Sequence, residues 1–132
     1  MKSYHCKVEV LLEPIGHPIV EVVCNNQVKT MRLFHGPSWV SFEFDQLAGP
    51  LQLTVEHRGR APSDGVTAVE IKSVKINGIE SPKILYQGLY YPVGMPGRRT
   101  TYIDFNGVWV LDFSAPVYTW LHNTLGLGWI YD

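Results

Sequence analysis

Two Asn-Gly pairs constrain the fold of this chain more than any other feature. One pair is Asn77-Gly78 and the other is Asn106-Gly107, and apolar residues flank both. A type I′ turn requires positive φ at both central residues, and Asn followed by Gly tolerates this conformation better than other pairs. Each pair therefore predicts a tight hairpin between two antiparallel strands.

Short stretches of strand-forming residues recur along the chain. Apolar and polar residues alternate most clearly in residues 40–44 and 51–56, which is typical of a sheet with one face in water. The predicted strands are residues 4–12, 18–25, 28–35, 38–44, 51–58, 66–77, 83–87, 99–105 and 107–113. Short strands separated by Gly, Pro and Asn predict an all-β fold, a two-sheet antiparallel β-sandwich that is jelly-roll-like.

Two local features refine this expectation. The alternation in residues 66–77 changes phase at Ser73, which predicts a β-bulge or a bend. One short C-terminal helix is expected, with Ser114 as its N-cap, Pro116 in its first turn and Gly126 at its end. A chain of 132 residues fits a single domain, residues 1–132.

The two cysteines are expected in the core. A first hairpin centred on Ile15 would place Cys6 opposite Cys24, and Glu9 opposite Glu21. Reduced thiols are the favoured interpretation of the cysteine pair, and a cross-strand disulfide is the alternative. The two glutamates would form a solvated pair, bind a cation, or indicate a different register.

Charge and hydropathy argue against two classes of partner. The net charge is −1, and acidic and basic residues are interspersed, so we expect no nucleic-acid partner. No apolar stretch approaches the ~20 residues of a membrane span, so no membrane partner is expected. The first residues run into a strand pattern and do not resemble a signal peptide, which predicts synthesis in a cytoplasm.

No catalytic or metal-binding motif stands out. The chain has no Gly-x-Ser-x-Gly sequence, its five histidines lack ligand spacing, and its two cysteines do not form Cys-x-x-Cys. We therefore expect a protein that is not an enzyme and that uses no metal and no cofactor.

Aromatic rings and arginines gather in residues 81–99 and at the C-terminus. Rings beside guanidinium groups can bind sugars, and the same residue types anchor protein interfaces. The alternative is a loop whose rings only cover the edge of the sandwich. The candidate interface or glycan-binding residues are Tyr86, Tyr90, Tyr91, Arg98, Arg99, Trp109, Trp129 and Tyr131. Trp109 also fits the role of a core anchor.

The second half of the chain resembles a known group of proteins in the order of its segments. These segments are residues 53–57, 69–79, 86–92, 106–109 and 112–121. Their order resembles small β-sandwich proteins encoded by tailed phages. The resemblance implies a structural component of a virion, such as a capsid decoration, fibre, collar or tail accessory protein. Its implied partners are other virion proteins and copies of itself, and its implied location is the virion.

The hairpin Val74-Lys75-Ile76-Asn77-Gly78 is also similar, more weakly, to that of calcium-dependent xylan-binding modules. Residues 57–65 depart from that family because they lack an acidic cluster. Together with the Tyr-rich loop, the similarity gives the alternative function, a small carbohydrate-binding module that binds glycan.

Overall fold

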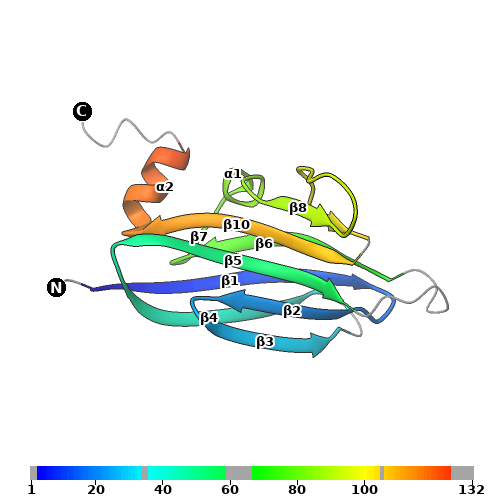
Figure 1. Ribbon diagram of the computed structural model, residues 1–132. Helices are drawn as coiled ribbons and strands as arrows, with labels where there is room; N and C mark the ends of the chain where they lie inside the picture. Colours follow the sequence, from blue (N-terminus) through cyan, green and yellow to red (C-terminus); the bar gives the residue numbers. More distant parts are fainter. Residues whose placement is uncertain (1–2, 34–35, 59–66, 105, 126–132) are drawn as a thin grey trace.

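The protein is a sandwich of two five-stranded antiparallel sheets with two short helices, as a computed structural model shows for residues 3–33, 36–58, 67–104 and 106–125 (Figure 1). The first sheet contains β4 (Ser38–Leu47), β1 (Ser3–Ile15), β6 (Ala68–Ile76), β7 (Ile79–Glu80) and β9 (Tyr102–Ile103). The second sheet contains β3 (Gln27–Arg32), β2 (Ile19–Cys24), β5 (Gly49–Arg58), β10 (Gly107–Ala115) and β8 (Leu89–Pro92). The helices are α1 (Pro82–Leu85) and α2 (Val117–Leu125). The predicted all-β sandwich is confirmed.

The core lies between the two sheets and follows from the alternation within each strand. In β10, the side chains of Trp109, Leu111 and Phe113 are buried, and the residues between them are more exposed. Val8 and Val10 of β1 are fully buried in the facing sheet. Each such side chain contributes about 1.5–3 kcal/mol by leaving water.

The expected first hairpin is wrong, because β1 and β2 belong to different sheets. Cys6 pairs with Phe44 on β4, and Cys24 pairs with Leu53 on β5. Both cysteines are nevertheless buried, and both are free thiols. Gly16, at φ 73°, lies in the connection that carries the chain from one sheet to the other. This connection replaces the predicted tight turn.

The predicted pairing of Glu9 with Glu21 is wrong for the same reason. Glu9 lies opposite Ser41 and Lys75 in the first sheet. Glu21 lies on β2 in the second sheet, where its opposed neighbours are on β3 and β5. The two carboxylates therefore never face each other.

The predicted bulge near Ser73 is confirmed. The register between β1 and β6 shifts between Leu11 and Leu12, which lie opposite Ser73 and Ile71. Lys72 is the extra residue and points outward, whereas Ile71 and Ser73 are buried. The bulge is what allows the change of phase along β6.

The first Asn-Gly pair forms the predicted turn. Asn77 and Gly78 have φ of 51° and 80° and join β6 to β7. The Asn77 side chain also reaches β1, where its Oδ1 accepts from the Lys7 N–H at 2.8 Å and its Nδ2 donates to the His5 carbonyl at 3.2 Å. This turn therefore also fixes the start of β1.

The second Asn-Gly pair does not join two paired strands, so that prediction is wrong. The strand before it, β9, pairs with β6 in the first sheet, whereas β10 lies in the second sheet. Gly107 serves close packing instead, since a Cβ there would lie 2.5 Å from the Tyr91 carbonyl oxygen. Glycine lets β10 and β8 approach each other at this point.

The expected C-terminal helix exists, but its start differs from the prediction. Ser114 belongs to β10, and α2 begins at Val117, directly after Pro116. The predicted end at Gly126 lies outside the described residues. The ring of Trp120 packs edge-on against Phe113 with centroids 6.0 Å apart, which holds α2 on β10.

The predicted strand at residues 83–87 is wrong. Those residues begin in α1, whose N-cap is Ser81: its Oγ accepts from the Lys83 N–H at 3.2 Å. The stretch from 81 to 99, where aromatic rings and arginines gather, contains this helix and the strand β8. Neither helix in the described parts of the chain is long and apolar enough to cross a membrane.

Candidate functional site

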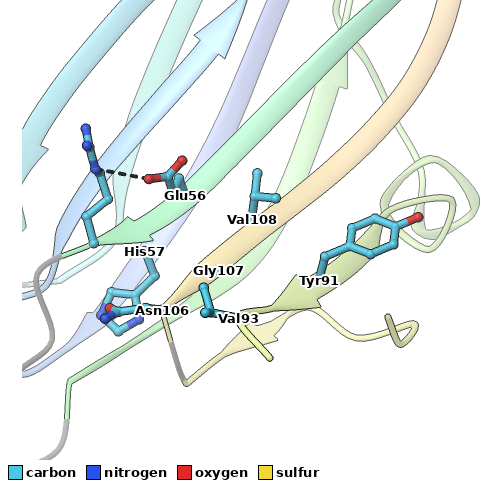
Figure 2. A pocket seen from close by; sticks show the side chains of 8 residues that line it. Glu56, His57, Tyr91, Val93, Asn106, Gly107 and Val108 are labelled. Atoms are coloured by element: carbon cyan, nitrogen blue, oxygen red, sulfur yellow. Dashed lines mark ion pairs between the residues drawn. The ribbon is translucent and has the colours of Figure 1, made fainter. Parts of the chain in front are cut away.

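An open cleft lies on the second sheet, where β5 ends and β10 begins beside β8. Its volume is about 350 Å³. The strands contribute Glu56, His57, Arg58, Gly107, Val108 and Tyr91. Figure 2 shows Glu56 at one side of this cleft and the ring of Tyr91 at the other, with Val108 between them. Three strands that are distant in sequence therefore build one surface.

Strand register explains why these side chains meet. Val108 lies directly opposite Glu56 on β5 and directly opposite Tyr91 on β8. Opposed residues in antiparallel strands point to the same face of a sheet. Their neighbours Val55 and Trp109 point the other way and are buried. The row from Glu56 to Tyr91 is thus the outer face of the sheet.

Tyr91 presents an aromatic ring that is both accessible and positioned. The residue is 45% exposed. The ring lies against Gly97, where an added Cβ would be only 2.7 Å from the Tyr91 Cε1 atom. Contact with the Gly97 backbone restricts the ring on one side, so less rotamer freedom is lost when a ligand packs on it.

The opposite wall is charged. Glu21 and Glu56 face each other on β2 and β5, and like charges in this arrangement repel. Arg58 joins them: its Nη1 lies 2.6 Å from Glu21 Oε2, and its Nε lies 3.0 Å from Glu56 Oε1. Figure 2 draws the Arg58–Glu56 ion pair as a dashed line. The guanidinium therefore orients the two carboxylates and balances part of their charge.

His57 supports the cleft from beneath. Its ring is 1% exposed, and its Nε2 lies 3.3 Å from the Thr67 hydroxyl. His57 pairs with Gly107 of β10 and with Val20 of β2. Its position in the middle of three strands makes it a packing residue at the base of the cleft.

Among the predicted site residues that the structure describes, only Tyr91 lines this cleft. Tyr90 and Trp109 are fully buried, which confirms Trp109 as a core anchor and leaves neither ring free to stack on a ligand. Tyr86 is exposed, and its carbonyl accepts a hydrogen bond from Arg99.

Arg98 has a structural role. Its guanidinium lies over the Tyr90 ring, 5.5 Å from the centroid, and its Nη2 lies 2.9 Å from Asp104 Oδ1. Its backbone exchanges two hydrogen bonds with Tyr90. The remaining predicted residues, Trp129 and Tyr131, lie outside the described residues.

Sequence reasoning missed the charged wall of the cleft. Glu56 and Arg58 end a predicted strand and look like an ordinary polar face. The sequence gives one indication of their role. Glu56 and Arg58 are two residues apart, with His57 between them, which places both on the same face of β5. Which strands flank β5 was the missing information.

Metal ligands are not grouped in the part of the chain that the structure describes. No three His, Cys, Asp or Glu side chains in it lie close enough together to hold a metal ion. What the cleft offers is an aromatic face, the carboxylate of Glu56 and the guanidinium group of Arg58.

Two solved structures share this fold. One is a vCBM60 in complex with galactobiose, at TM-score 0.58 and 12% identity, with 80% of this chain and 96% of that chain covered. The other is the selenomethionine form of vCBM60, described as linking two families of calcium-dependent carbohydrate binding modules by circular permutation. It matches at TM-score 0.60 and 14% identity, with 80% and 89% of the two chains covered. At these identities the likeness concerns the fold.

No protein-family model and no curated protein sequence matches the chain. Both similar structures are of carbohydrate-binding modules, in line with the weaker of the two resemblances in the sequence. The resemblance to tailed-phage virion proteins finds no support in these comparisons.

Proposed function

We propose that this protein is a carbohydrate-binding module, without catalytic activity, that holds a short glycan in the cleft between Glu56 and Tyr91. The observation that carries the proposal is the exposed Tyr91 ring, held against Gly97, across Val108 from a carboxylate–guanidinium pair. An apolar surface beside a few convergent polar groups is typical of small-ligand sites.

The chemistry of the two walls suits a sugar. A pyranose has an apolar face of C–H groups, which packs on an aromatic ring, and a rim of hydroxyl groups. Those hydroxyls can donate to the carboxylate of Glu56 and accept from the guanidinium of Arg58. The volume of about 350 Å³ lies at the lower end of the range for ligand pockets, so it suits one or two sugar units.

The fold comparison supplies the first ligand to test. One of the two similar structures contains galactobiose. We infer that this chain binds a glycan of similar size, and galactobiose is the natural starting probe.

The test is binding to galactobiose and to a glycan array by the intact chain and by two variants. Tyr91→Ala removes the ring in the cleft and should abolish binding at that cleft. Tyr86→Ala removes another exposed ring outside the cleft, and it keeps the backbone carbonyl that Arg99 uses, so it should bind like wild type. Equal binding by all three proteins would contradict the site, and no binding by wild type to any glycan would contradict the function.

Assembly into a virion stays a prediction from the sequence resemblance alone. It requires self-association or capture by another virion protein, whereas a glycan-binding module needs neither. Light scattering on the chain with and without residues 126–132 distinguishes the two, since assembly through these apolar C-terminal residues predicts an oligomer that truncation dissociates.

A further inference from the structure

A second cleft lies at the opposite end of the sandwich. Its volume is about 450 Å³, larger than that of the first. It is lined by Tyr4, His5 and Lys7 from β1, by Asn77, and by Val117 and Tyr118 from α2. The glycan site proposed above does not use these residues.

The wall formed by β1 is held in place by Asn77. Its side-chain oxygen accepts from the Lys7 N–H at 2.8 Å, and its side-chain nitrogen donates to the His5 carbonyl at 3.2 Å. The Asn77 N–H donates in turn to the Lys7 carbonyl at 2.8 Å. Three hydrogen bonds thus fix the backbone from which Tyr4, His5 and Lys7 project.

The wall formed by α2 is fixed by the core. Val117 is buried, and Trp120 packs edge-on against Phe113 of β10. Tyr118 lies one residue along the helix from Val117 and points to solvent, with 64% of its surface exposed. This ring is accessible, yet the backbone that carries it is anchored.

The polar groups of this cleft resemble those of the first. His5 lies between two carboxylates, 3.1 Å from Asp45 Oδ1 and 3.4 Å from Glu43 Oε1. The hydrogen bond to Asp45 raises the pKa of His5. Within the described residues the ammonium of Lys7 forms no ion pair, so its N–H groups can donate to a ligand. An exposed tyrosine and a lysine thus line this cavity, and the two carboxylates lie behind them as partners of His5.

From this geometry we propose a second glycan-binding site in the cleft between Tyr118 and Lys7, which would make the protein bivalent. The proposal rests on the proposed function, because it assigns the same ligand class to a second cavity. The sugar face would pack on Tyr118, and Lys7 would donate to its hydroxyls. Glu43 lies opposite Lys7 on β4, and its carboxylate offsets the positive charge of the ammonium group, which favours a neutral sugar.

The two clefts are too far apart to hold one disaccharide. The strand β10 begins at Gly107, which lines the first cleft. It ends at Ala115, directly before Pro116, which lines the second cleft. At about 3.4 Å per residue, this strand spans about 27 Å. Two clefts at the ends of one strand can therefore bind two separate glycan chains, or distant parts of one long chain.

Titration calorimetry with galactobiose, or with the best ligand from the array, tests the proposal. Wild type should bind two equivalents of sugar, and Tyr91→Ala and Tyr118→Ala should each bind one. The double variant should bind none. Tyr118→Phe keeps the ring and should still bind two, and circular dichroism checks that each variant is folded.

The outcomes separate the two proposals. One equivalent bound by wild type, unchanged in Tyr118→Ala and lost in Tyr91→Ala, overturns the second site and leaves the proposed function standing. One equivalent that is lost in Tyr118→Ala and kept in Tyr91→Ala overturns the first cleft and leaves the second. An absence of binding to every glycan tested contradicts both.

Discussion

Tyr91 and Gly97 are in direct contact, and this contact sets the position of the ring that dominates the proposed glycan site. A Cβ at residue 97 would lie 2.7 Å from Tyr91 Cε1 and 2.8 Å from Cδ1. Atoms do not approach this closely, so any side chain at residue 97 must displace the ring. The position of the Tyr91 ring therefore depends on glycine at residue 97.

Gly97→Ala should weaken glycan binding without unfolding the protein. The displaced ring is half exposed and can rotate into water, so we expect a change in the free energy of unfolding below about 1 kcal/mol. Affinity should fall by about tenfold or more, because the stacking surface moves. Titration calorimetry and thermal unfolding measure the two effects. Met95→Ala changes another exposed side chain nearby and should leave both unchanged; an unaltered affinity in Gly97→Ala would show that the ring position is irrelevant.

Arg58→Met should destabilise the second sheet through charge. Its removal leaves Glu21 and Glu56 opposed with no cation between them. We expect a loss of about 1 kcal/mol in the free energy of unfolding, measured by urea denaturation, and a smaller loss in 1 M salt because salt screens the repulsion. Lys72→Met, which breaks the exposed 3.4 Å pair with Glu13, is the control and should cost less. A loss in Arg58→Met that does not depend on salt would contradict this account.

Substitutions of Asn77 should distinguish the stability that comes from its turn conformation from the stability that comes from its side-chain hydrogen bonds. Asn77→Gly keeps the positive φ but loses the two side-chain hydrogen bonds to β1, and should cost about 1–2 kcal/mol. Asn77→Ala loses the same bonds and must also adopt φ near 51°, so it should cost about 1 kcal/mol more. Chemical denaturation of both variants tests the order. Equal stability of the two would mean that the turn conformation is not a constraint.

Cys24 should make stability depend on alkaline pH. Burial, with a smaller effect of Cys6, raises the pKa of its thiol from 9.0 to about 12. The unfolded chain loses this proton near pH 9, whereas the folded chain keeps it. The stability contribution is therefore complete below pH 9 and is lost progressively as the pH rises toward 12.

The corresponding measurement is the free energy of unfolding between pH 8 and pH 11, in wild type and in Cys24→Ala. Wild type should lose stability more steeply than the variant over this range. Thiol-reactive reagents should also modify native Cys24 far more slowly than the unfolded chain, since only the thiolate reacts. Parallel pH profiles in the two proteins would be inconsistent with a buried, neutral thiol.

Local signals predicted the fold well where a feature depends on neighbouring residues. The turn at Asn77-Gly78 and the bulge near Ser73 follow from φ preferences and from the phase of alternation. Signals that depend on which sheet a strand joins failed. Asn106-Gly107 looked like a hairpin turn, but Gly107 is required by the approach of β8 to β10, which no local pattern reports.

The candidate site was less predictable than the fold for the same reason. Tyrosines in one loop look alike in sequence, yet Tyr90 is fully buried and Tyr91 is exposed because adjacent residues of a strand point to opposite faces. Glu56 and Tyr91 lie on the same surface because each is directly opposite Val108 in a neighbouring strand. Identifying this row requires the strand order β5-β10-β8, which the sequence does not state.

The most direct test of the proposed function is a titration of isotopically labelled protein with galactobiose, followed by NMR. Glycan binding at the first cleft predicts shifts at Glu56, Arg58, Tyr91 and Val108 that saturate with added sugar and vanish in Tyr91→Ala. A spectrum without shifts at these four residues would contradict it, whether the added sugar shifts other residues to saturation or leaves the whole spectrum unchanged.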